Sequence, residues 1–136
     1  MSTITQTAPP AKGMLWTGRI LGGLVVLFLL FDGAIKLIPL DVVITTSQEL
    51  GIPTHLARTL GILTLAGTLL YAWPRTAVLG AVLLTGYFGG AIYVHVRAGS
   101  PLFSHTLFGV YLGLLAWGGL WLRDQRLRAL FPFRHD

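Results

Sequence analysis

The sequence predicts an all-α, polytopic membrane protein built as a four-transmembrane-helix bundle. Three observations lead to this prediction. The 136-residue chain is 54% hydrophobic and only 11% charged, with a mean hydropathy of +0.72, whereas a soluble domain carries about 25% charged residues. Four apolar runs are each long enough to cross a bilayer. Residues that interrupt helices, mainly proline and glycine, fall between these runs.

The four predicted spans are residues 14–38, 55–73, 76–96 and 102–122. Because backbone groups in lipid must be hydrogen-bonded within their own segment, we expect each span to be a helix. A longer connection joins the first two spans. Within it, residues 41–50 are expected to form a short helix along the membrane surface, with Asp41 as its cap.

The two ends of the chain are polar. Residues 1–13 are expected to form a flexible cytoplasmic tail, residues 14–122 the transmembrane domain, and residues 123–136 a basic cytoplasmic tail that meets anionic lipid. Seven of the ten basic residues fall on the side of the bundle that holds both termini. The positive-inside rule therefore places both termini in the cytoplasm.

Composition also excludes several kinds of chemistry. The chain has no cysteine, which rules out disulfides, cysteine-ligated metals and thiolate catalysis. The net charge is +5, but the basic residues flank apolar runs, so they fit lipid headgroups better than nucleic acid. No nucleophile elbow or zinc-binding helix motif is present, so the catalytic residues are unknown and it is uncertain whether the protein is an enzyme.

Glycines recur four residues apart on three of the spans. The pairs are Gly18 with Gly22, Gly86 with Gly90, and Gly109 with Gly113. In lipid, small residues let helix backbones approach closely. We therefore expect all three pairs to lie in helix–helix contacts, and we expect Gly90→Leu to disrupt the bundle more than Leu83→Ala does.

Ionisable and polar side chains gather at the outer end of the predicted bundle. Asp32 and Lys36 lie four residues apart on one face of the first span, so we expect them to pair inside the bundle. Intramembrane charge is a functional-site hypothesis by default, although residues near helix ends are also polar simply because they meet water. The candidate ligand-binding residues are Asp32, Lys36, Glu49, His55, Tyr93, His95, Arg97 and His105. Their spacing does not predict a metal site.

At this point the sequence resembles the DoxX-like family of small four-helix membrane proteins. The similar stretches are residues 31–37, 79–91, 94–99, 101–103 and 117–130, within a likeness that covers about residues 17–132. The resemblance implies an inner-membrane location. Because the family takes its name from a subunit of a thiosulfate:quinone oxidoreductase, it also implies a link to quinones by analogy.

Three functional hypotheses follow. The first is a small inner-membrane protein that binds a small ligand or a quinone at its outward-facing polar cluster, within a redox-linked assembly. The second is a structural or accessory subunit without a ligand site, whose glycine faces pack against a partner. The third is a small transporter. It ranks last, because transporters place charge near the bilayer midplane on broken helices, whereas these spans are unbroken and their charge is off-centre. Beyond the lipid bilayer, the expected partners are a second copy of the chain or a redox subunit.

Overall fold

The protein is a helical bundle in the computed structural model, which describes residues 12–38 and 40–134. The expected tail at residues 1–13 lies mostly outside this range, as do residues 135–136. The described part contains helices and turns and no strand. Its α-helices are α1 (Lys12–Leu37), α2 (Asp41–Leu50), α3 (Ala57–Ala72), α4 (Ala77–Ala98), α5 (Phe108–Arg123) and α6 (Gln125–Leu130).

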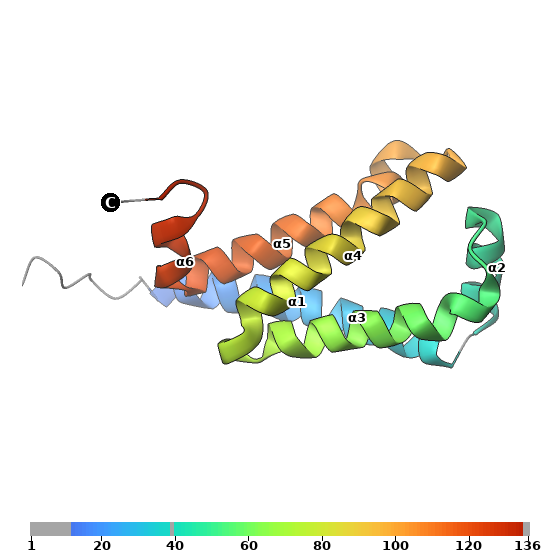
Figure 1. Cartoon of the computed structure of the whole chain (residues 1–136). Coiled ribbons are helices and arrows are strands. Elements are labelled where there is room, and N and C mark those ends of the chain that lie inside the picture. Colours follow the sequence, from blue (N-terminus) through green and yellow to red (C-terminus); the bar gives the residue numbers. More distant parts are fainter. Residues whose placement is uncertain (1–11, 39, 135–136) are drawn as a thin grey trace, which may run out of the picture.

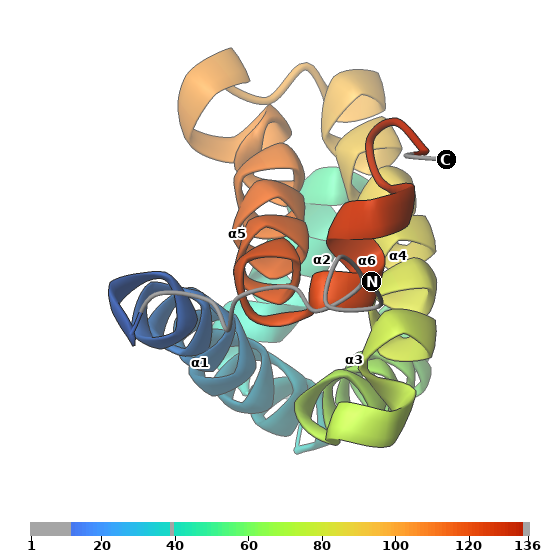
Figure 2. The same ribbon diagram turned by 90° about the vertical axis from the view of Figure 1, so that its left-hand side faces the viewer.

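The four long helices form two pairs (Figure 1). Helices α1 and α3 run side by side, as do α4 and α5, and the two pairs diverge toward one end of the molecule. Helix α2 lies at this divergent end, which we call the α2 end, and α6 lies at the opposite end, the α6 end. Viewed along the bundle, the four helices surround a common centre (Figure 2), where Val25, Leu29, Tyr71 and Leu84 are fully buried.

Three stretches of the described chain are long and apolar enough to cross a membrane: Lys12–Leu37, Pro74–Ala98 and Leu102–Arg123. The predicted second span is shorter than the sequence suggested. Pro53 and a 3₁₀ turn at Thr54–Leu56 precede α3, which has 16 residues. Helix α5 also has 16 residues, but the turn at Leu102–Thr106 extends it to a stretch of 22 residues. An all-α membrane protein is therefore confirmed, with α3 packed between α1 and α4.

The short helix at residues 41–50 forms with the predicted bounds, but Asp41 does not cap it. Leu40 is the N-cap residue and no side chain caps the helix there. Asp41 instead occupies the first turn, where its negative charge suits the helix dipole. The helix ends at Gly51, whose φ of 73° is one that glycine adopts without strain.

The basic C-terminal segment packs back onto the bundle. Asp124 accepts hydrogen bonds from the backbone N–H groups of Arg126 and Leu127 and so caps α6. Leu127 is buried, and the Arg128 guanidinium donates to the carbonyl oxygens of Trp121 and Leu122 at 2.7 and 2.9 Å. This segment thus satisfies carbonyls that the end of α5 would otherwise leave open.

Glycines bring helix backbones into contact at several crossings, as expected for Gly18, Gly22 and Gly109. A Cβ added at Gly18 would lie 2.7 Å from the Gly119 carbonyl oxygen, and one at Gly109 would lie 3.1 Å from the Phe88 carbonyl oxygen. At Gly22 the space is taken by the Arg123 guanidinium, whose central carbon lies 5.1 Å from the centre of the Tyr71 ring.

The expectation for Gly86 and Gly90 is wrong. A Cβ added at either position would meet no other atom within 4 Å. Helix α4 is rotated so that these two glycines face open space at the α2 end, while Gly80 meets the backbone of Tyr71 near the α6 end. The leucine side chain of Gly90→Leu therefore has open space beside α4, and the structure gives no reason for this substitution to disrupt the bundle.

Gly119→Ala should destabilise the bundle, whereas Gly89→Ala should leave its stability unchanged. A Cβ at Gly119 would lie 2.8 Å from the Gly22 backbone nitrogen and 2.9 Å from the Gly18 carbonyl oxygen, so α1 and α5 must separate. We expect a cost of about 1–3 kcal/mol, typical of overpacking. Gly89 has no atom within 4 Å of an added Cβ. Thermal unfolding in detergent measures both, and equal melting temperatures would contradict the contact.

Candidate functional site

The centre of the candidate site is the ion pair between Asp32 and Lys36. The Lys36 Nζ atom lies 2.7 Å from the Asp32 Oδ2 atom. In the isolated chain the Asp32 side chain is 26% exposed and the Lys36 side chain 22% exposed. Both line cavities between helices. The prediction that this pair forms inside the bundle is confirmed. Pairing compensates two charges that would otherwise be costly in lipid.

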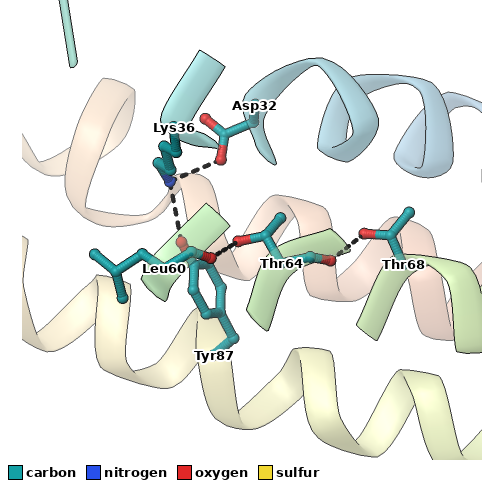
Figure 3. Close-up of polar contacts among 6 residues, drawn as sticks. All are labelled: Asp32, Lys36, Leu60, Thr64, Thr68 and Tyr87. Carbon is teal, nitrogen blue, oxygen red and sulfur yellow. Dashed lines mark hydrogen bonds and ion pairs between the residues drawn. The ribbon is translucent and has the colours of Figure 1, made fainter. Parts of the chain in front are cut away.

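A third group, Tyr87 of α4, completes this polar cluster (Figure 3). Lys36 Nζ donates a second hydrogen bond to the Tyr87 hydroxyl oxygen, at 3.0 Å. Tyr87 is not predictable as a site residue, because a tyrosine in the middle of an apolar helix carries no local signal. Lys36 thus connects α1 to α4 across the bundle. We refer to Asp32, Lys36 and Tyr87 as the polar cluster.

On one side of the polar cluster is a cavity of about 490 Å³. Helices α1 to α4 all contribute to its walls, and most of the lining side chains are apolar. The wall formed by α4 contains Gly86, Gly90 and Ala91, while Val43 and Ser47 of α2 cover the cavity from the α2 end. Both of these α2 side chains are buried. The glycines therefore leave space beside α4, and α2 covers one side of a cavity that is otherwise partly open.

On the other side of the polar cluster is a smaller cavity of about 160 Å³. It lies between α1, α4 and the start of α5, and its lining includes Phe28 and Phe108, whose ring centres are 5.2 Å apart. Asp32, Lys36 and Tyr87 line both cavities. The polar cluster therefore stands between a large apolar cavity and a small one.

The structure brings two of the predicted histidines to this region. His95 lines both cavities and His105 lines the smaller one, and their ring centres lie 6.0 Å apart. The His95 Nδ1 atom is hydrogen-bonded to the Ser100 hydroxyl at 2.9 Å, and the His105 Nδ1 atom to the Ser104 hydroxyl at 2.7 Å. Side chains of the connection between α4 and α5 thus orient both rings.

The other predicted site residues lie elsewhere. Glu49, His55, Tyr93 and Arg97 are exposed, and none of them lines either cavity. They occupy the last turns of α2 and α4 and the turn before α3. Within residues 12–38 and 40–134, no three His, Asp or Glu side chains come together as a group that could hold a metal ion.

Fold and site together define a small helical membrane protein with a mostly apolar cavity that ends at a neutralised polar cluster. Comparison with family models matches residues 20–119 to the DoxX-like family. Because the match covers most of the chain, the protein belongs to this family, as its sequence indicated. Searches of curated proteins and of solved structures find no match.

Breaking the ion pair from one side should cost more stability than removing it altogether. Lys36→Met leaves the Asp32 carboxylate without its partner at the cavity wall, and we expect a loss of about 1–3 kcal/mol. The double variant Asp32→Asn/Lys36→Gln keeps similar shapes without charge and should be less destabilised. Unfolding of Lys36→Gln, Asp32→Asn and their double variant in mixed micelles completes a double-mutant cycle, with Lys36→Met measured beside it. Additive effects of the two single changes would contradict coupling between the two residues.

Proposed function

We propose that the protein binds one small, largely apolar molecule in the cavity of about 490 Å³. The observation that carries this proposal is the convergence of apolar walls on a single polar cluster. Ligand sites in proteins are typically concavities of about 300–1,000 Å³ with mainly apolar walls and a few oriented polar groups. The ligand's apolar body would lie against Gly86 and Gly90, and its polar head would meet Lys36 and Tyr87.

A quinone is the ligand class that we favour. A flat ring fits against the α4 wall, where two glycines leave the helix backbone uncovered, and quinone oxygens accept hydrogen bonds from donors such as Lys36. A bound quinone would supply two-electron redox chemistry. The chain has no cysteine, so it has no thiol or disulfide of its own to exchange electrons with the ligand. We therefore place the protein in a redox-linked assembly in which a partner subunit does so.

The positions of the glycines support the ligand-binding hypothesis over the accessory-subunit hypothesis. Gly18, Gly22 and Gly109 pack against other parts of the same chain, so they are not free to contact a partner. Gly86 and Gly90 line the cavity. The glycine pairs that could have formed a partner surface therefore serve the bundle and its cavity.

Gly90→Leu should expel the ligand without unfolding the protein. The side chain would project into the cavity, where no atom lies within 4 Å of an added Cβ. Gly89→Leu is the matched control, because Gly89 is the adjacent residue, has equally open surroundings and lines neither cavity. Native mass spectrometry of protein released from lipid nanodiscs should detect one retained molecule in wild type and Gly89→Leu, and none in Gly90→Leu. Detection of bulk lipid alone in all three would refute the proposal.

We also propose an inner-membrane location with both termini in the cytoplasm, which follows from the distribution of basic residues. Lys12, Arg19, Arg75 and Arg126 lie near the α6 end, where the chain also carries Arg128. A fluorescent protein fused to the C-terminus should be bright, and alkaline phosphatase fused there should be inactive. Active phosphatase with a dark fluorophore would show the opposite orientation.

A further inference from the structure

We infer that the polar cluster selects a ligand with an uncharged hydrogen-bond acceptor, a carbonyl oxygen, and that Tyr87 and Lys36 both donate to it. This inference rests on the proposed function and specifies the chemistry of the ligand's polar head. It assigns Tyr87 as a specificity-determining residue.

The polar cluster has two hydrogen-bond donors without an acceptor in the described chain. An ammonium group has three N–H donors, and Lys36 uses one toward Asp32 and one toward Tyr87. The Tyr87 hydroxyl accepts the bond from Lys36 through its oxygen, so its own hydrogen remains available as a donor. Within the described chain, no acceptor for that hydrogen is found. One N–H and one O–H, on atoms 3.0 Å apart, are therefore left at a wall shared by both cavities.

The charge of the polar cluster favours an uncharged ligand. Asp32 lies 2.7 Å from Lys36, so the positive charge of the lysine is already balanced before any ligand enters. A carboxylate or phosphate ligand would approach the Asp32 carboxylate and be repelled, and a cationic ligand would approach the Lys36 ammonium. Electrostatics in a cavity with apolar walls thus favours an uncharged head group.

The two donor atoms are held close to each other by the fold. Two donors held 3.0 Å apart can both approach a single carbonyl oxygen through bent hydrogen bonds, because the acceptor directions of a carbonyl oxygen are broad. Lys36 is fixed by its ion pair within α1, and Tyr87 is fixed by its place in α4 beside the buried Phe88. Both donors are therefore oriented before binding, which limits the entropy that the ligand must offset.

Two probes with the same ring skeleton test this inference. Menadione carries two carbonyl groups, and 2-methylnaphthalene has none. The absence of cysteine means that menadione has no thiol to alkylate in this chain. Tyr87→Phe should weaken menadione binding about three- to tenfold, the effect of one lost hydrogen bond. It should leave 2-methylnaphthalene binding unchanged, and 2-naphthoate, the anionic probe, should bind more weakly than menadione.

Tyr93→Phe is the matched control, because Tyr93 lies on the same helix, is 65% exposed and lines neither cavity. Dissociation constants are measured by native mass spectrometry in detergent for the wild type and the three variants Tyr87→Phe, Tyr93→Phe and Gly90→Leu. Equal menadione affinity in wild type and Tyr87→Phe would overturn the inference, as would equal weakening of both neutral probes or tighter binding of 2-naphthoate. If wild type binds neither neutral probe better than Gly90→Leu does, the proposed cavity function falls as well.

Discussion

The structure depends on where helix backbones touch. Contacts between the two helix pairs are concentrated toward the α6 end, where Gly18 meets Gly119 and Gly80 meets Tyr71. Toward the α2 end, close glycine contacts lie within each pair: a Cβ added at Gly61 would lie 2.9 Å from the Gly33 carbonyl oxygen, and Gly109 faces Phe88. The pairs are thus joined at one end and free to diverge at the other. Because close packing is the main force that holds helices together in lipid, this distribution of contacts produces both the bundle and its cavity.

Divergence leaves an opening into which the ion pair fits. A carboxylate at the centre of a spanning helix costs about 2.5–3.5 kcal/mol on insertion scales, and less toward the helix end where Asp32 lies. An opening with apolar walls alone would therefore still disfavour Asp32. The four-residue spacing of Asp32 and Lys36 supplies the counter-charge from the same helix, and Tyr87 adds a bond from the opposite pair. On α3, the buried hydroxyls of Thr64 and Thr68 donate to backbone carbonyls one turn earlier. The threonine hydroxyls on α3 are therefore satisfied within their own helix, and the ion pair keeps the polar cluster neutral.

The sequence could predict features that depend on local spacing. The bounds of α2 follow from the proline and glycine residues around it, and the Asp32–Lys36 pair follows from helical periodicity. Rotation of a helix about its own axis was not predictable, since lipid and bundle interior are both apolar and hydrophobic periodicity is weak. For this reason Gly86 and Gly90 were assigned to a helix contact, Tyr87 was missed, and Tyr93 was included. The predicted second span begins at residue 55, two residues before α3, because a 3₁₀ turn at Thr54–Leu56 follows Pro53 and leads directly into the helix.

The same residue type thus has two opposite roles in one chain, and the difference is decided by what faces it. At Gly119 the missing side chain is replaced by another helix, so the glycine contributes cohesion. At Gly90 nothing within the chain replaces it, and the exposed glycine leaves the wall of the partly open cavity bare instead. An unfilled apolar void forfeits dispersion contacts, and glycine within a helix costs about 0.5–1 kcal/mol relative to alanine. Two such positions one turn apart, opposite a polar cluster with unused donors, give up stability that a purely structural bundle would keep. A bound molecule that fills the void would restore those contacts.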